Sequence, residues 1–169
     1  MKTILDSVLI GFLGLGGPEM IVILFIGIIV LLPTIFYLIT LQKTLKEVSE
    51  ENRKLPAGQV WLILIPLFGL IWQYIVVNRI ANSLKAEFAK RNITIEQNKP
   101  GIGVGLAYCS LHCFRLIIVL FFAAMVISKQ NNIAAQFIPL VGLIVSTAAF
   151  IFWIIYWVKI ADYKSRLIQ

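Results

Sequence analysis

The sequence predicts an all-α integral membrane protein, for three reasons. Hydrophobic residues make up 60% of the 169 residues and charged residues only 14%, whereas globular domains average about half apolar and a quarter charged. Apolar runs of about 20 residues alternate with short charged segments, a pattern typical of membrane-spanning helices. The runs lack the alternation of barrel strands, and only helices or closed barrels satisfy their backbone in lipid, so we expect helices.

Four apolar segments are long enough to cross a hydrocarbon core of about 30 Å. They cover residues 20–41, 59–78, 102–127 and 134–158, and they predict a single transmembrane domain over residues 1–169, built as a four-helix bundle. Pro66 and Gly69 leave a rival topology open, in which residues 59–78 turn back to the side from which they entered. Residues 1–17 are apolar but too short to cross, and we expect them at the membrane interface or partly inserted.

The second connector predicts an amphipathic helix over residues 79–91. Ile80, Leu84 and Phe88 follow one another at intervals of four residues, which places them on one helical face. Such a helix suits the membrane interface. The alternative is that the second span continues into water as an ordinary solvated helix.

The net charge of +7 indicates contact with anionic lipid headgroups rather than with nucleic acid. The basic residues gather at the ends of apolar runs, where headgroups attract them, and no nucleic-acid-binding fold or aromatic-basic groove accompanies them. With four spans, nine Lys and Arg residues flank the side that carries both termini and five flank the other. They are Lys2, Arg79, Lys85, Lys90, Arg91, Lys99, Lys159, Lys164 and Arg166, against Lys43, Lys46, Arg53, Lys54 and Lys129. This excess predicts cytoplasmic termini.

Two short sequences recur in the second and fourth spans. IPLFGL (65–70) has a counterpart in IPLVGL (138–143), and RIAN (79–82) has one in KIAD (159–162). The pattern suggests two helical hairpins in tandem, as in transporters built from parallel repeats. The alternative is the shared composition of membrane helices.

One longer stretch carries a resemblance. The segment GQVWLILIPLFGLIWQYIVVNRIANSLKAEF, together with WIIYWVKIADYK near the end, resembles a group of small bacterial multi-pass membrane proteins of unknown function. The resemblance covers about half of the chain. It implies a location in the bacterial inner membrane and implies no activity, so no residue roles are carried over.

The third span places its polar and small residues on one face. At 100° per residue, an arc of about 160° contains them: Gly101, Gly105, Tyr108, Cys109, His112, Cys113 and Arg115. Leu111, Phe114 and Ile118 lie opposite and are expected to meet lipid. Gly101 and Gly105 are spaced for close helix packing. We therefore expect the polar face to point inward or toward a partner.

Arg115 is a charge near the middle of its span, which costs from about 2.5 to well over 10 kcal/mol unless the charge is satisfied. No carboxylate is expected at that depth. The neutral candidates are Gln73 in the second span and Ser146 and Thr147 in the fourth. An anion, a lipid headgroup or an acidic residue of another protein is the alternative.

The remaining chemistry is limited. Cys109, His112 and Cys113 offer soft ligands at i, i+3 and i+4, but the other half of a tetrahedral set is missing and Arg115 would repel a cation. We expect no metal site, no cofactor and no catalytic residues. The preferred hypothesis is a non-enzymatic subunit that binds or regulates a partner membrane protein, or a second copy of itself, through this face. The alternatives are a small oligomeric channel or transporter with Arg115 on an aqueous path and, third, a redox or metal enzyme.

Overall fold

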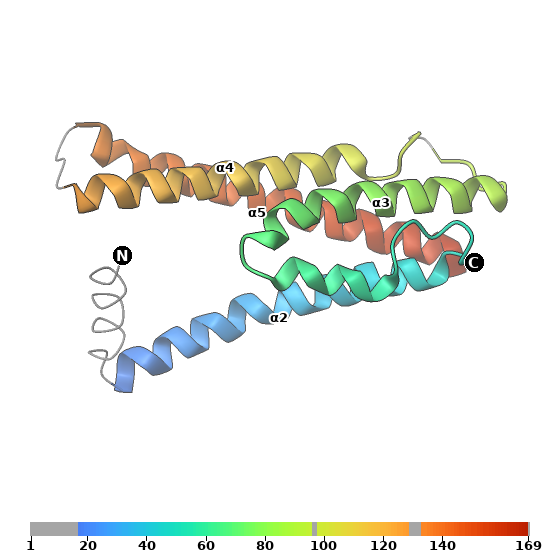
Figure 1. Cartoon of the computed structure of the whole chain (residues 1–169), viewed down its shortest axis with the longest axis horizontal. Helices are drawn as coiled ribbons and strands as arrows, with labels where there is room; N and C mark the ends of the chain where they lie inside the picture. Colours follow the sequence, from blue (N-terminus) through green and yellow to red (C-terminus); the bar gives the residue numbers. More distant parts are fainter. Residues whose placement is uncertain (1–16, 96–97, 129–132, 169) are drawn as a thin grey trace. The chain divides into compact units, whose positions relative to one another are not determined.

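The computed structural model describes residues 17–95, 98–128 and 133–168. These residues are almost entirely helical and contain no strand, so the predicted all-α class is confirmed. The elements are α2 (Gly17–Glu47), η1 (Ala57–Leu64, a 3-10 helix), α3 (Phe68–Lys90), α4 (Ile102–Ile127) and α5 (Ile133–Ile168), shown in Figure 1. A boundary between two compact units falls inside α2, between Tyr37 and Leu38. The segment predicted at the interface, residues 1–17, lies outside the described residues except for Gly17.

Three of the described helices are long and apolar enough to cross a membrane: α2, α4 and α5. α4 has the bounds expected from the sequence, whereas α2 and α5 continue beyond the predicted spans to Glu47 and Ile168. Large apolar side chains cover their surfaces, such as Phe121, which is 59% exposed, and Leu143, which is 63% exposed. Apolar surface on this scale is expected for a membrane protein and not for a water-facing one.

The predicted second span, residues 59–78, is not one helix. η1 ends at Leu64, the chain turns at Ile65–Leu67, and α3 begins at Phe68 and runs back alongside η1 (Figure 1). Leu67 adopts a positive φ of 63°. At Gly69 a Cβ atom would lie 2.0 Å from the carbonyl oxygen of Ile63, so only glycine permits this close approach. We call η1, the turn and the first half of α3 the apolar hairpin. The expectation of a continuous helix is wrong, and the rival path, which turns back at Pro66 and Gly69, describes the backbone.

α3 continues without interruption through the predicted amphipathic connector to Lys90. Ile80, Leu84 and Phe88 do share one face, as predicted, and each is 0% exposed. The stripe of Ile80, Leu84 and Phe88 packs inside the protein. It therefore faces neither lipid, as in an interfacial helix, nor water, as in a solvated one. Burying three such side chains stabilises this half of α3 by several kcal/mol.

The packing fixes the register of α3, α4 and α5. α4 packs along α5, and α3 packs on α4. A Cβ at Gly105 would lie 2.5 Å from Val77 Cγ1 and 2.8 Å from the Tyr156 ring, so these residues are level. The Tyr74 hydroxyl donates to Ser110 Oγ at 3.3 Å. Farther along, a Cβ at Gly142 would lie 3.5 Å from Ile118, which shows that Ile118 faces α5 rather than lipid.

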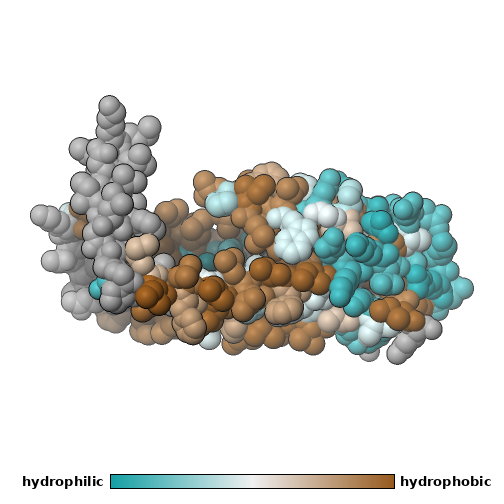
Figure 2. All heavy atoms as spheres, turned by 90° about the horizontal axis from the view of Figure 1, so that it is seen from below, coloured by the Kyte–Doolittle hydropathy of each residue, from teal (hydrophilic) through white to brown (hydrophobic). Residues whose placement is uncertain are grey.

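Hydrophilic residues gather at one end of the unit Leu38–Gln169. Figure 2 shows them over the end at which α3 and α5 finish in Figure 1. We call this region, which comprises residues 42–56, 79–95 and 159–168, the charged end. The apolar hairpin points away from it.

Candidate functional site

The polar face predicted on α4 runs from a buried to a half-buried environment. Cys109 is 0% exposed and Tyr108 is 9% exposed, next to the close contact at Gly105. His112, Cys113 and Arg115 follow and are half-buried. On the opposite side Phe114 is 51% exposed, as expected for a residue that meets lipid.

Arg115 has no hydrogen-bond acceptor among the described residues. Since Ile118 is level with Gly142 and α4 and α5 run antiparallel, Ser146 lies at the depth of Arg115. Thr147, the other candidate on α5, donates its hydroxyl to its own helix, at Leu143 O, at 2.9 Å. No hydrogen bond joins Arg115 to Ser146 or Thr147 within the described part of the chain.

Gln73 is not at the depth of Arg115. It lies one turn from Val77 and level with Cys109, roughly one to two helical turns away from Arg115. Gln73 is 3% exposed, and its amide nitrogen has no acceptor in the residues described. An unpaired buried donor costs about 1–3 kcal/mol, so this amide is a second unsatisfied group of the apolar region.

The thiols of Cys109 and Cys113 are free. The ring of His112 lies 6.0 Å from that of Tyr108. Among the described residues, no group of three or more His, Cys, Asp or Glu side chains is arranged to hold a metal ion. The arrangement therefore offers hydrogen-bonding and packing groups, and it offers no assembled ligand set.

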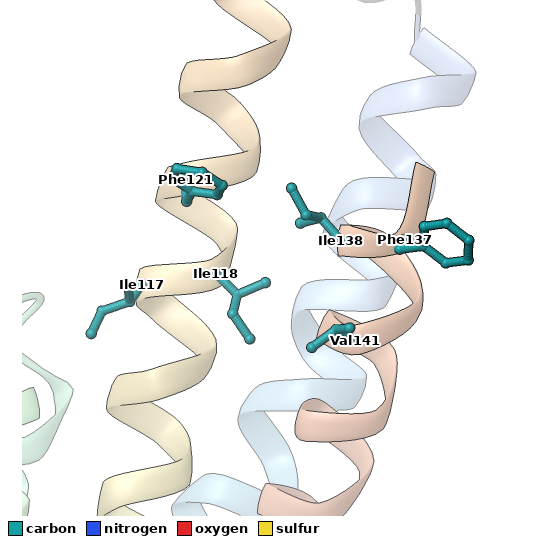
Figure 3. A pocket seen from close by; sticks show the side chains of 6 residues that line it. All are labelled: Ile117, Ile118, Phe121, Phe137, Ile138 and Val141. Carbon is teal, nitrogen blue, oxygen red and sulfur yellow. The ribbon is translucent and has the colours of Figure 1, made fainter. Parts of the chain in front are cut away.

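A shallow apolar groove lies between α4 and α5, beyond Arg115 (Figure 3). Six aliphatic or aromatic side chains line it: Ile117, Ile118, Phe121, Phe137, Ile138 and Val141. None of these side chains can form a hydrogen bond. Its lining is entirely apolar and offers nothing that would orient a polar ligand.

A second polar cluster, which was not predicted from the sequence, lies at the charged end. Its centre is Glu87 of α3, which is 1% exposed. The carboxylate accepts hydrogen bonds from the backbone N–H of Ser49 at 3.2 Å and its hydroxyl, from Asn52 Nδ2 at 2.8 Å, and from Arg91 Nε at 2.7 Å. Burial by itself raises the pKa of Glu87, but the hydrogen bonds from Ser49, Asn52 and Arg91 outweigh it and lower the pKa to about 2.

Two arginines complete this cluster by capping helix ends. Arg53 donates to the carbonyls of Leu45 at 2.7 Å and Val48 at 2.9 Å, at the end of α2. Arg91 donates to Glu47 O at 3.1 Å and also to Leu167 O, near the end of α5. Because the last carbonyls of a helix lack intrahelical partners, these bonds satisfy both helix ends. The cluster fastens α2, α3 and α5 together, and we refer to it as the clasp.

The sequence contained a signal for the clasp. Glu87 follows Ile80 by seven residues, so it lies on the apolar stripe of Ile80, Leu84 and Phe88, and Arg91 follows one turn later. An acid on an apolar stripe requires a partner when the stripe is buried.

No protein-family model, no curated protein and no solved structure matches this chain. The resemblance to small bacterial membrane proteins stays a prediction, and the function has to be argued from the geometry alone.

Proposed function

We propose that this protein is a multi-pass subunit of the bacterial cytoplasmic membrane, which binds a partner membrane protein through the polar face of α4 around Arg115. The observation that carries the proposal is the exposed turn of the apolar hairpin at the depth of this unpaired arginine. Both features need a neighbour that the described residues do not supply.

The depth follows from the register. Tyr74 is level with Ser110, and α3 and α4 are antiparallel, so Phe68 is level with Leu116, one residue from Arg115. The apolar part of α5, from Phe137 to Val158, has its middle near Thr147, which is close to the level of Arg115. The hairpin thus enters the membrane from the charged end and turns at about the midplane.

A turn at that depth is costly if lipid surrounds it. Leu64, Ile65 and Leu67 are 43%, 46% and 75% exposed, and the backbone from Ile65 to Leu67 is not helical. Irregular backbone within the hydrocarbon is tolerated where protein or a water-filled cavity covers it. A half-exposed guanidinium at the same depth has the same requirement, which favours a partner that covers both.

The distribution of charge supports an orientation. With a re-entrant hairpin, both long connectors and the end of α5 lie on one side, and 12 of the 15 Lys and Arg residues flank that side. They are Lys43, Lys46, Arg53, Lys54, Arg79, Lys85, Lys90, Arg91, Lys99, Lys159, Lys164 and Arg166. Apart from the intramembrane Arg115, only Lys2 and Lys129 remain, and they fall on the other side. The positive-inside rule makes the charged end cytoplasmic, with three spans and the start of α2 on the far side. The expectation that both termini are cytoplasmic requires four spans and stays a prediction.

The test is the size of the complex extracted from membranes in mild detergent. Arg115→Leu removes the charge and is expected to release the partner, which lowers the apparent mass to that of the free subunit. Arg115→Lys keeps a cation and is expected to retain a measurable fraction of the complex. Phe114→Leu, on the exposed side of the same helix, is the matched control and should leave the mass unchanged. An unchanged mass for Arg115→Leu would refute the proposal.

A second candidate, an oligomeric anion channel or transporter, is favoured by one observation. Gln73 and Arg115 are both polar groups without acceptors in the described residues, as expected if water reaches them. Cys113 lies between their depths and reports on such a path. Rapid reaction of Cys113 with a charged thiol reagent, together with anion flux in liposomes, would favour this candidate over the first.

A further inference from the structure

We propose that an anionic phospholipid binds along the exposed face of α3, with its phosphate at Arg79 and Lys54 and an acyl chain against the apolar hairpin. The proposal rests on the depth assigned to the hairpin, and it is independent of the partner bound at Arg115.

The fold holds the guanidinium of Arg79 against the backbone of Lys54. Arg79 Nη1 donates to the backbone carbonyl of Lys54 at 2.9 Å. The backbone N–H of Lys54 donates to Ser83 Oγ at 2.8 Å, and Ser83 in turn donates to Arg79 O at 2.8 Å. Ser83 is 0% exposed, so this triangle is rigid, whereas the side chains of Lys54 and Arg79 are exposed. Two exposed basic side chains therefore extend from neighbouring backbone positions that these bonds hold in place.

Neither Arg79 nor Lys54 forms an ion pair with a described residue. The ion pairs in the described chain use Lys90 with Glu51, Arg91 with Glu87, and Arg166 with Asp162. All of them lie farther from the apolar region than Arg79. A guanidinium has five N–H donors, of which the contact with Lys54 uses one, and its planar fork matches phosphate oxygens. Arg79 and Lys54 together can therefore bind one phosphodiester.

The cations lie at headgroup level. Arg79 is two residues beyond Val77, which is level with Tyr156 of α5. Trp157 and Lys159 follow directly on α5, and such aromatic and basic residues settle where the hydrocarbon ends. A phosphate at this depth belongs to a lipid headgroup.

Below the cations, the same face of α3 is apolar and aromatic. Trp72 precedes Arg79 by seven residues, which is two turns on one face, and its indole N–H donates to Gln59 O at 2.8 Å. The ring of Phe68 stacks on Trp72 at 5.2 Å, and the neighbouring Ile71 is 69% exposed. Phe68 and Arg79 are about 16 Å apart along the axis, close to the thickness of one leaflet. The α3 face from Phe68 to Arg79 is thus about as long as one leaflet is thick, and it carries charge only at the Arg79 end.

The experiment titrates phosphatidylglycerol and phosphatidylcholine against the purified full-length protein and counts bound lipids by native mass spectrometry. Arg79→Gln with Lys54→Gln is expected to weaken phosphatidylglycerol binding about tenfold or more. Lys85→Gln with Lys164→Gln removes the same charge elsewhere at the charged end and should change binding less than twofold. Arg79→Lys with Lys54→Arg keeps both charges and should also bind.

Three further results decide the proposal. Lys54→Gln alone leaves every described hydrogen bond in place and should weaken binding several-fold, so the test does not depend on a variant that fails to fold. Trp72→Ala should weaken lipid binding and leave inorganic phosphate binding unchanged. Three results would overturn the proposal. The Lys85 and Lys164 control could lose as much phosphatidylglycerol binding as the Arg79 and Lys54 variant, or the protein could bind phosphatidylcholine with equal affinity. The third is full displacement of the bound phosphatidylglycerol by millimolar inorganic phosphate. Arg115→Leu should keep the lipid, so failure of the partner proposal is distinguishable.

Discussion

Single residues decide how closely the helices approach, and Gly105 is the clearest case. Its absent side chain leaves room for Val77 and for the Tyr156 ring, and Tyr156 is 1% exposed, so it cannot move aside cheaply. The two glycines Gly101 and Gly105 made close packing predictable from the sequence. The identity of the neighbours was not predictable, because it depends on helices that are distant in the chain.

Gly105→Ala is expected to lower the free energy of unfolding by about 1–3 kcal/mol, as overpacking does in a closed core. Gly103→Ala on the same helix is the control, since nothing lies within 4 Å of its added Cβ and alanine is the better helix former. Thermal unfolding in detergent should show a lower midpoint for the first variant only. Equal midpoints would contradict the close contact.

Glu87 contributes stability that depends on pH. Its pKa falls from 4.5 to about 2 on folding, so the contribution is complete above about pH 4.5 and is lost as the pH falls toward 2. The shift corresponds to about 3 kcal/mol. Glu87→Gln should destabilise the protein at pH 7 and flatten the stability profile between pH 4.5 and 2.

The control for Glu87 is Glu51→Gln, which removes an acid that is 65% exposed and pairs with Lys90 at the surface. Exposed pairs contribute at most about 1 kcal/mol, so this variant should stay close to the parent at both pH values. If the two variants behave alike, Glu87 is not the buried centre of the clasp.

Among the helices, the two similar hexapeptides adopt different backbone structures. IPLFGL forms the turn of the apolar hairpin, whereas IPLVGL lies inside the continuous helix α5, with Pro139 in its interior. Local sequence therefore predicted the position of the kink in the first segment and not whether the chain would reverse there. The surroundings of the two glycines differ: Gly69 admits the Ile63 carbonyl of its own hairpin, while Gly142 faces Ile118 of α4.

Gly69→Ala is expected to open the hairpin, because the added Cβ would meet a backbone oxygen at 2.0 Å, which no rotamer change can relieve. A loss of about 2–3 kcal/mol is expected, seen as a lower unfolding temperature and faster proteolysis of η1. Gly58→Ala, also in the hairpin, has no atom within 4 Å of its Cβ and should match the parent. A stable Gly69→Ala variant would show that the turn does not need this contact.

For the whole molecule, composition sufficed to predict the helical class. It also predicted that three of the four apolar segments form long apolar helices, since long uncharged runs have few alternatives in lipid. The path of residues 59–78 did not follow from composition, because this segment is apolar enough for a span and yet its backbone turns back after Leu64. The clasp was not predicted either, because Glu87 and Arg91 lie in a charged connector of the sequence. Their partners are at the ends of α2 and α5, which are distant in the chain.

Labelling of single cysteines from each side of the membrane distinguishes three spans from four. Single cysteines are introduced at the exposed positions Glu50, Asn92 and Ser128, after Cys109 and Cys113 are changed to serine. With a re-entrant hairpin, Glu50→Cys and Asn92→Cys should react with an impermeant maleimide only after the cytoplasmic side is opened, and Ser128→Cys should react in intact cells. Labelling of Glu50→Cys and Asn92→Cys from opposite sides would establish that residues 59–78 cross.

The clasp also sets an order of events during synthesis. Arg91 can bond to Glu87 and to the end of α2 as soon as α3 has emerged from the ribosome, but its partner Leu167 follows it by 76 residues. The bond from Arg91 to Leu167 can therefore form only after α4 and α5 have been made. The full set of Arg91 hydrogen bonds therefore depends on the last helix of the chain as well as on the first described one.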